Sequence, residues 1–482
     1  MMDWEVVIGL EVHVQLKTKS KMFCSCSTDF DSLPNENICP ICTGQPGVLP
    51  KINRRAIELA LIASKILNCK INRISRFARK NYFYPDLPKN YQISQYEEPI
   101  GYDGYLELPS GKRIGIMRVH QEEDTGKLLH YIGSRKLDYS LIDFNRSGIP
   151  LLEIVSKPDI RSPEEAVEYL TFLRLNLIYA GISDCDMEKG SLRCDANLSV
   201  RRKGEKELGV KVEVKNMNSF KSVKDALSYE ARRQIKLLEK GEKIIQETRL
   251  WDERGGVTKS MRRKEYAHDY RYFPDPDLVE LEFDEEFLNE VFSKIPELPL
   301  ERRRRYIDEL SLSEYEADVF ISNKEASDFF EEVIKGENDK SFFKEASSWI
   351  LNDLLGILNE RKLSFNELKL KPEHLKELVK LKISGKITSK IGKEIFPVML
   401  EKGEFPSKLL KELDMEQIQD EDEIRRICSC VLKENQKVVE DYKKGKKQAI
   451  GRLVGEVMKK TRGRANPRAV NEILRNLLES SP

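Results

Sequence analysis

The sequence predicts an α+β protein whose N-terminal part is strand-rich, with a mostly antiparallel sheet, and whose C-terminal part is all-α. Up to about residue 293, short runs alternate apolar and polar residues between Gly, Pro, Asn and Asp, as strands with one solvated face do. After Ile295-Pro-Glu-Leu-Pro299 this alternation fades, and apolar residues recur with helical spacing, as at Leu351, Leu354, Leu355 and Leu358. The chain of 482 residues is therefore expected to form three domains, with a hinge near Phe405-Pro406: residues 1–293, 294–405 and 406–482.

The elements of the first domain can be predicted in order. Residues 7–16 form the first strand, with Ile8, Leu10, Val12, Val14 and Leu16 on one face and Gly9, Glu11, His13 and Gln15 on the other. Further strands are expected at 150–155, 194–201 and 210–216. Helices are expected at 54–67, 162–180 and 223–239, the second with Ser162 as N-cap, Pro163 in the first turn and Glu165 at the capping-box position.

The charge balance and the N-terminus exclude several classes of protein. The 82 basic and 81 acidic residues nearly cancel, so any contact with nucleic acid must use a local patch. The N-terminus lacks the basic and apolar regions of a signal peptide, and no apolar run approaches the ~20 residues of a membrane span. Nine cysteines without a secretion signal favour reduced thiols in the cytoplasm over a disulfide framework.

Four of these cysteines form two closely spaced pairs, Cys24-Ser-Cys26 and Cys39-Pro-Ile-Cys42. Thiolates bind zinc tetrahedrally, and a closed set of four leaves no open coordination position, so the pattern predicts a structural zinc site. The alternatives are buried free cysteines and a redox pair, although no thioredoxin-like pattern surrounds the second pair. The remaining cysteines are expected to be packing residues: Cys69, Cys185, Cys194, Cys428 and Cys430.

Several predicted strands share a polar face rich in carboxylates. Glu11 and His13 lie on the first strand, and Asp195 and Asn197 share a face of a later one. The same pattern holds for Lys211, Glu213 and Lys215, while Glu153 interrupts an apolar strand and Glu122 and Glu123 precede Gly126-Lys127. Any one of these strands alone is typical of a solvated sheet face. Together, carboxylates, histidine, asparagine and lysine are what a Mg²⁺–nucleotide site needs, with oxygen ligands for the cation and lysines for the phosphates.

Two basic segments suggest contact with RNA. Lys80 and Lys89 lie among the aromatic residues of 77–91, where rings can stack on bases, although an aromatic core loop is an equal alternative. Near the C-terminus, Lys459, Lys460, Arg462 and Arg464 form a basic turn between two helices, the second opened by Asn466-Pro467. This turn is either a phosphate-binding patch or a solvated face.

Taken together, the motifs resemble those of the B subunits of tRNA-dependent amidotransferases over essentially the whole chain. They are Gly9-Leu-Glu-Val-His-Val-Gln-Leu16, Arg79-Lys-Asn-Tyr-Phe-Tyr-Pro-Asp86, Glu122-Glu-Asp-Thr-Gly-Lys127, Pro150-Leu-Leu-Glu-Ile-Val155, Gly190-Ser-Leu-Arg-Cys-Asp-Ala-Asn197, Lys215-Asn-Met-Asn-Ser-Phe220, His268-Asp-Tyr-Arg-Tyr-Phe-Pro274 and Gly451-x-x-Val-Gly-x-x-Met-Lys459 with Ala465-Asn-Pro467. The resemblance implies a strand-rich cradle domain, an all-α helical domain and an all-α YqeY-like tail domain that holds tRNA.

The resemblance also implies an activity and partners. In this family the B subunit uses ATP and Mg²⁺ to phosphorylate the side-chain carboxylate of Glu-tRNA(Gln) or Asp-tRNA(Asn). Ammonia from a glutaminase A subunit then displaces the phosphate, and a small C subunit completes the heterotrimer. An aminoacyl-tRNA synthetase is left open as a further partner.

Carried onto this chain, the resemblance implies roles for the residues of the polar face. Glu11 and His13 are expected to bind Mg²⁺ together with Glu122 or Glu123. The catalytic acidic site would comprise Glu11, His13, Glu123, Glu153, Asp195 and Glu213, while Asn197 with Lys211 or Lys215 would orient phosphates. The four cysteines match the zinc-bearing members of the family.

Three other functions are compatible with parts of the sequence. A non-catalytic RNA-binding scaffold predicts that Glu11→Ala leaves activity intact, and another ATP-dependent ligase for a small acid predicts ATP turnover without tRNA. A zinc-dependent hydrolase is disfavoured, because four thiolates leave the metal no open position.

Overall fold

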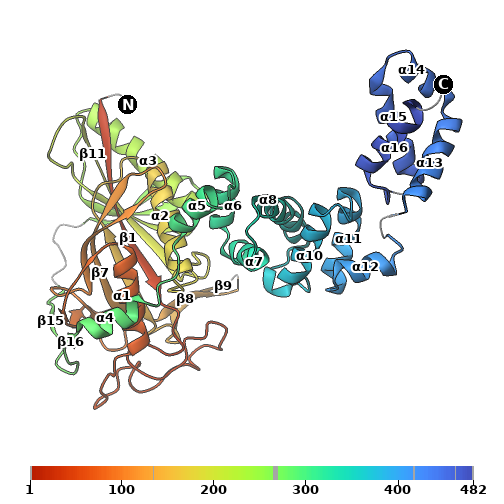
Figure 1. Ribbon diagram of the computed structural model, residues 1–482. Helices are drawn as coiled ribbons and strands as arrows, with labels where there is room; N and C mark the ends of the chain where they lie inside the picture. The colour runs from red at the N-terminus through yellow and green to blue at the C-terminus, as the bar shows by residue number, and fades with distance from the viewer. Residues whose placement is uncertain are drawn as a thin grey trace. The chain divides into compact units, whose positions relative to one another are not determined.

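The structure, a computed structural model, describes residues 3–133, 135–263, 270–415, 418, 420–461 and 463–479 (Figure 1). The chain forms two compact units, Met1–Pro299 and Leu300–Pro482. The first unit is built on a large sheet and the second is helical, which confirms the predicted α+β class. Separate apolar cores fall within residues 306–410 and 424–478 of the second unit; the boundary near residue 405 stays a prediction.

A sheet of nine strands forms the centre of the first unit. Its neighbouring strands pair antiparallel except β12 and β13, which are parallel. The spatial order is β14 (Val257–Arg263), β13 (Glu247–Asp252), β12 (Val212–Met217), β11 (Leu192–Arg202), β1 (Trp4–Gln15), β10 (Pro150–Ser156), β7 (Arg113–Glu123), β6 (Gly101–Glu107) and β2 (Lys70–Ile71).

Strand β1 lies near the middle of this sheet and alternates as predicted. Leu10, Val12 and Val14 are buried, whereas Glu11 and His13 on the other face are partly exposed. Helices pack on the sheet (Figure 1): α1 (Arg54–Ile66) contacts β6 and β7, α3 (Phe220–Glu239) contacts β11, β12 and β14, and α2 (Pro163–Tyr179) packs beside α3. The apolar side chains of β1 therefore belong to a core, and its polar side chains remain available for chemistry.

The helix starts agree closely with the sequence prediction, with two differences. Ser162 caps α2 by accepting from the backbone N–H of Glu165, but the Glu165 carboxylate accepts from the N–H of Arg161, so the predicted reciprocal bond of a capping box is replaced. Helix α3 begins at Phe220 rather than at the expected residue 223, because Ser219 caps it by accepting from the N–H of Ser222.

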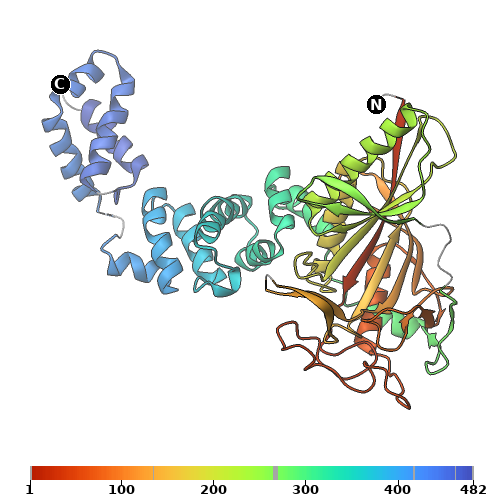
Figure 2. The same ribbon diagram turned by 180° about the vertical axis from the view of Figure 1, so that it is seen from behind.

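Smaller sheets and a long loop complete the first unit. The small sheets are β15 (Phe273–Pro274), β4 (Ala78–Asn81) and β5 (Tyr91–Ser94); β16 (Leu281–Glu282) and β3 (Ile74–Ser75); and the hairpin β8 (Lys127–Ile132) and β9 (Arg135–Asp143). Between β1 and α1 runs the loop that carries the paired cysteines, and it lies beside this hairpin (Figure 2). Asn35 bonds to Asp143 and Ile142, which joins the loop to the end of β9. Helix α4 (Glu285–Phe292) packs on α1.

The second unit is helical throughout its described residues. Its helices are α5 (Pro299–Asp308), α6 (Glu314–Ser322), α7 (Lys324–Ile334), α8 (Lys340–Ser348), α9 (Leu355–Arg361), α10 (Pro372–Ile383), α11 (Ser389–Lys402), α12 (Pro406–Glu412), α13 (Glu421–Glu434), α14 (Gln436–Lys443), α15 (Ile450–Lys460) and α16 (Pro467–Glu479), with short turns at Phe365–Glu367 and Lys447–Ala449. Helix α16 opens at Pro467, as predicted.

One helical prediction is wrong in detail. Leu351 and Leu354 were expected to share a regular α-helix with Leu355 and Leu358, but Trp349–Leu354 is a π-helix, and α9 begins only at Leu355. The wider π turn rotates the face, so Leu354 and Leu358 are buried while Leu351 and Leu355 are only partly covered. Among the described residues, no helix has the length and apolar character needed to cross a membrane.

Candidate functional site

The polar face of the sheet gathers four ionisable side chains from three neighbouring strands. His13 of β1 pairs with Glu153 of β10, which pairs in turn with His120 of β7. The Nε2 atom of His13 lies 3.4 Å from Glu153 Oε2 and 3.5 Å from Glu122 Oε1, and His120 Nε2 lies 3.0 Å from Glu153 Oε2. One ligand atom each from His13, Glu122 and Glu153 lies within 4.8 Å of the others, which is close enough for one metal ion. We call these three residues the His13 group.

Electrostatics in the His13 group favour a positive charge between the two carboxylates. Burial by itself disfavours the charged imidazole, but the hydrogen bonds and charges of Glu122 and Glu153 outweigh it and raise the pKa of His13 to about 10. Burial likewise opposes ionisation of Glu153, yet His120 and His13 hold its pKa well below its usual value. Positive charge around the two carboxylates therefore stabilises their ionised forms, with Lys80 acting on Glu122 and His120 and His13 acting on Glu153.

A second polar cluster lies beside the first on the strands β1, β11 and β12. The amide Nδ2 of Asn197 donates to Glu11 Oε1 at 2.8 Å. Lys215 forms ion pairs with Asp195 and, at 3.1 Å, with Glu213. Burial lowers the pKa of Lys215, but the charges of these two acids raise it by more, so the pKa of Lys215 lies above its usual value. Glu11 thus lies on the same face of β1 as His13, but its carboxylate accepts from the Asn197 amide and does not belong to the His13 group.

Two predicted site residues lie apart from these clusters. Glu123 follows Glu122 on β7 and so points to the opposite face of the strand, where it accepts from the N–H of Ile93 and pairs with Lys89. Lys211 precedes β12 and is exposed. The structure therefore brings Glu122, and not Glu123, to His13.

Lys80 lies at the edge of the His13 group. Its Nζ is 4.0 Å from Glu122 Oε2 and 5.2 Å from the centre of the Tyr270 ring. Burial lowers the pKa of Lys80, but the charge of Glu122 raises it by more, so the pKa of Lys80 lies above its usual value. Lys80 and Lys89 are only 21% and 11% exposed, and both are paired with acids, so these two lysines extend the sheet site rather than an open surface.

Three residues of the site had no predicted role. His120 lies two residues before the motif that begins at Glu122, and alternation along β7 places its side chain on the same side as that of Glu122. Asp124 and Arg193 form an ion pair of 2.8 Å close to His13. Only the strand order reveals that Arg193 is the neighbour of His13, because they pair across β1 and β11.

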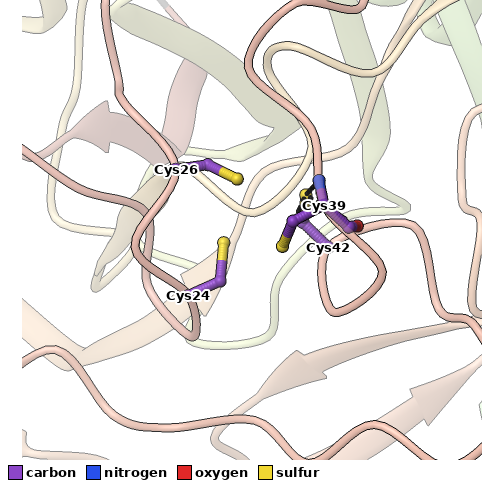
Figure 3. A group of neighbouring side chains, drawn as sticks. All are labelled: Cys24, Cys26, Cys39 and Cys42. Atoms are coloured by element: carbon purple, nitrogen blue, oxygen red, sulfur yellow. Dashed lines mark hydrogen bonds between the residues drawn. The ribbon is translucent and has the colours of Figure 1, made fainter.

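The four paired cysteines converge on one point (Figure 3). The sulfur atoms of Cys24, Cys26, Cys39 and Cys42 all lie within 4.8 Å of one another, although the pairs come from different turns of the loop. The backbone N–H of Cys39 donates to Cys42 Sγ at 3.2 Å, an interaction that stabilises a thiolate. Four converging sulfurs are the donor set of a closed structural zinc site.

The surroundings of Cys42 favour its ionised form. The hydrogen bond with Cys24 is the strongest influence, and together with the Cys39 backbone and the Lys21 charge it lowers the pKa of Cys42 to about 4, although burial opposes this shift. Lys21 is fully buried, with its Nζ 3.6 Å from Cys42 Sγ. If the four thiolates held a divalent metal, this buried ammonium would compensate part of their negative charge.

The other cysteines mostly behave as predicted. Cys69, Cys185, Cys194 and Cys428 are buried packing residues. Cys430 is exposed, because it lies on the outer face of α13, and its sulfur is 3.5 Å from Lys460 Nζ.

The predicted basic residues of the C-terminal turn differ in their exposure and in whether an acidic side chain pairs with them. Lys459 is exposed, Lys460 pairs with Glu434 at 2.6 Å, and Arg464 Nη1 lies 3.4 Å from Asp414. Arg462 lies outside the described residues, as do His268 and Asp269 of the quoted motif.

Comparison with known proteins identifies what the chain is similar to. Residues 6–289 match the family described as the GatB/GatE catalytic domain, and residues 328–478 match the GatB domain family. The chain is 51% identical to the B subunit of the aspartyl/glutamyl-tRNA(Asn/Gln) amidotransferase of Carboxydothermus hydrogenoformans, over 99% of both chains. It is 50% identical to the protein of that name from Persephonella marina, over 99% of this chain and all of the relative, and 48% identical to that from Clostridium tetani, over 98% of both.

Proposed function

The chain belongs to the GatB/GatE family of tRNA-dependent amidotransferase B subunits, and on that premise we propose that the polar face of its sheet activates the side-chain carboxylate of Glu-tRNA(Gln) or Asp-tRNA(Asn). The observation that carries the proposal is the His13 group, in which an imidazole and two carboxylates from three strands meet within 4.8 Å. Lys80 lies at its edge, and Asn197 and Lys215 belong to the neighbouring polar cluster on β11 and β12, so basic and amide groups that suit a phosphate lie on the same face.

The proposed reaction has two balanced steps. An oxygen of the substrate carboxylate attacks the γ-phosphorus of ATP, the bond from that phosphorus to the bridging oxygen breaks, and ADP leaves. Ammonia then attacks the carbon of the acyl phosphate, the carbon–oxygen bond breaks, phosphate leaves, and the nitrogen loses a proton to form the amide. Activation is needed because an unmodified carboxylate would have to expel oxide, a far poorer leaving group than phosphate.

The donor set of the His13 group fits a divalent cation such as Mg²⁺. Two carboxylates and one imidazole are compatible with a site that keeps several water ligands, and the two carboxylates bring negative charge to the place where the cation would bind. When bound, such a cation would neutralise charge on the transferring phosphoryl group. Around it, His120 holds Glu153 in place through its 3.0 Å contact, and Lys80 supplies a further positive charge at Glu122.

The four-cysteine cluster is proposed to bind structural zinc. Between β1 and α1 the described chain forms no helix or strand, so its shape depends on cross-links. Four thiolates from two pairs would fix this loop, and with it the residues that bond to β9.

The wider assembly follows from the names of the relatives, which are subunits of a larger enzyme. We propose that a glutaminase A subunit and a small C subunit complete a heterotrimer, that it works in the cytoplasm where aminoacyl-tRNA is used, and that a synthetase can join it. In the tail, exposed Lys459 is the best candidate for a contact with tRNA phosphate, because Lys460 and Arg464 have acidic partners.

The test is ATP-dependent amidation of Glu-tRNA(Gln) and Asp-tRNA(Asn) by the assembled complex with added ammonium. We expect His13→Ala and Glu153→Gln each to reduce activity by roughly 10²-fold or more, since each removes a ligand or charge from the site. Glu5→Gln is the matched control, because Glu5 lies on the same face of β1 but pairs with Arg201 at 2.6 Å.

The outcomes separate the competing functions. Wild-type activity in both site variants, with the complex intact, would favour a non-catalytic scaffold and refute the proposal. ATP turnover that proceeds equally without tRNA would favour a ligase for a small acid. The two tRNA substrates, assayed in parallel, decide which of them this chain serves.

A further inference from the structure

Arg193 is held beside the His13 group by a buried carboxylate. Asp124 is 3% exposed, and its Oδ2 accepts from Arg193 Nη2 at 2.8 Å and from Gln15 Nε2 at 2.9 Å. The backbone of Asp124 is also fixed, since its N–H donates to the carbonyl of Ile149 and its carbonyl accepts from the N–H of Gly148. Asp124 is therefore a rigid anchor for the guanidinium group.

The sheet register places Arg193 in line with the proposed site. Arg193 of β11 pairs with His13 of β1, His13 pairs with Glu153 of β10, and Glu153 pairs with His120 of β7. Directly paired residues of antiparallel strands lie on the same face with their Cβ atoms about 5 Å apart. The four side chains thus form one row, and Arg193 is its cationic end.

The guanidinium group of Arg193 keeps unused hydrogen-bonding capacity. Its side chain is 37% exposed, so part of it reaches solvent on the polar face. Among the described residues, its hydrogen bonds run through Nη2 to Asp124, and its Nε is buried without a hydrogen-bond partner. The exposed part of the guanidinium group can therefore donate hydrogen bonds to a ligand on the polar face.

Chemistry at the His13 group requires such a cation. Both reactants of the proposed step are anionic, and a guanidinium presents parallel donors that match two oxygens of a phosphoryl or carboxylate group. Lys80 approaches the group from β4, whereas Arg193 approaches from β11, on the other side of His13.

We propose that Arg193, positioned by Asp124, binds the oxygen atoms of an anionic reactant next to the His13 group during carboxylate activation. This inference rests on the proposed function and adds to it a substrate-binding residue, Arg193, and a positioning residue, Asp124. The anionic group is either the phosphoryl group of ATP or the side-chain carboxylate of the aminoacyl-tRNA, and the two sources differ in which KM responds.

The test uses the assembled complex with both substrates varied. Arg193→Ala should reduce kcat/KM by roughly 10²–10³-fold, because it removes a donor to developing charge. Arg193→Lys should recover only part of the activity, because it keeps the charge but loses the paired donors. A raised KM for ATP identifies the phosphoryl group, and a raised KM for aminoacyl-tRNA identifies the carboxylate.

Chemical rescue distinguishes binding from folding. Added guanidinium should restore the activity of Arg193→Ala at least about tenfold, since the ion can occupy the place that Asp124 still defines. Asp124→Asn should lower activity, and added guanidinium should restore little of it, because Arg193 is still present but has lost the carboxylate that positions it. The matched control is Arg201→Ala on the same strand and face, whose side chain pairs with Glu5 at 2.6 Å and should show near wild-type activity without rescue.

The outcomes also separate this inference from the proposed function. Activity of Arg193→Ala within about twofold of wild type, or a loss that guanidinium does not restore, overturns the role of Arg193. If His13→Ala abolishes amidation in the same assay, the proposed function survives that result. If His13→Ala is also fully active, the proposed function itself fails.

Discussion

Glu230→Gln tests whether a buried ion-pair network holds helix α3 to the edge of the large sheet. Glu230 is 0% exposed, and its carboxylate accepts from Arg233 at 2.6 and 2.9 Å and from Thr258 of β14 at 2.9 Å. Arg249 of β13 lies 3.5 Å from the same carboxylate and 2.5 Å from Glu247. Two arginines therefore share two acids, and the substitution leaves only Glu247 to balance them.

The expected cost follows from this geometry. Removing one partner from a buried ion pair costs about 3–5 kcal/mol, and the lower end applies here because Glu247 remains and the arginines are partly exposed. A loss of about 3 kcal/mol corresponds to a factor of roughly 150 in the unfolding equilibrium. For a unit that spans Met1–Pro299, this loss lowers the melting temperature by about 5 °C.

The measurement is denaturant unfolding followed by tryptophan fluorescence. In a Trp349→Phe background, the remaining tryptophans, Trp4 and Trp251, both lie in the first unit, and Trp251 is on β13 next to the network. Glu239→Gln, at the exposed end of the same helix, is the control and should change stability by less than about 0.5 kcal/mol. A change below about 1 kcal/mol in Glu230→Gln would refute the assigned role of the network.

Three further predictions address the loop, the pH dependence and the packing. Removing zinc with a chelator, or the substitution Cys39→Ser, should make the loop between β1 and α1 sensitive to protease. Mass spectrometry of the fragments detects the cleavage sites. A digest that does not change would contradict a structural metal. Burial opposes ionisation of Glu247, but Ser260 and Arg249 lower its pKa. The ionised Glu247 therefore contributes to stability above about pH 4.5, and this contribution is lost as the pH falls through the pKa of Glu247 in the folded state. Glu247→Gln should make the free energy of unfolding less dependent on pH in the acid range. An unchanged pH dependence would contradict the ion pairing assigned to Glu247. Gly104→Ala would bring a Cβ within 2.4 Å of the Leu67 carbonyl and should destabilise by about 1–3 kcal/mol in calorimetry, whereas Gly356→Ala, with open space around it, should not destabilise.

Much of the polar face could be predicted from local pattern. Alternation along 7–16 and 194–201 correctly placed Glu11, His13, Asp195 and Asn197 on solvent-facing sides, because side chains of a strand alternate whatever its neighbours are. The same rule separates Glu122 from Glu123, but it applies only once the extent of β7 is known. Strand ends are set by packing and turns, which short stretches of sequence specify weakly.

The aromatic and basic segment at 77–91 shows a different limit. Composition left RNA contact and a core loop equally open, and RNA contact stays a prediction, while the structure shows that Lys80 pairs with Glu122 and Lys89 with Glu123. These acids lie more than thirty residues along the chain from the lysines. A charged side chain finds its partner through the fold, and residue type alone cannot identify that partner.

The sequence by itself determined the family, the α+β order of the elements, the convergent cysteine pairs and which strand faces carry polar groups. These features depend on short-range chemistry: periodicity of burial, capping, and the spacing of metal ligands. Only the tertiary structure decided that β1 lies between β10 and β11, that His13 meets Glu122 and Glu153, and that Asp124 holds Arg193 at their side. Strand order comes from burying the apolar faces of segments far apart in the chain, and that global packing brings the site residues together.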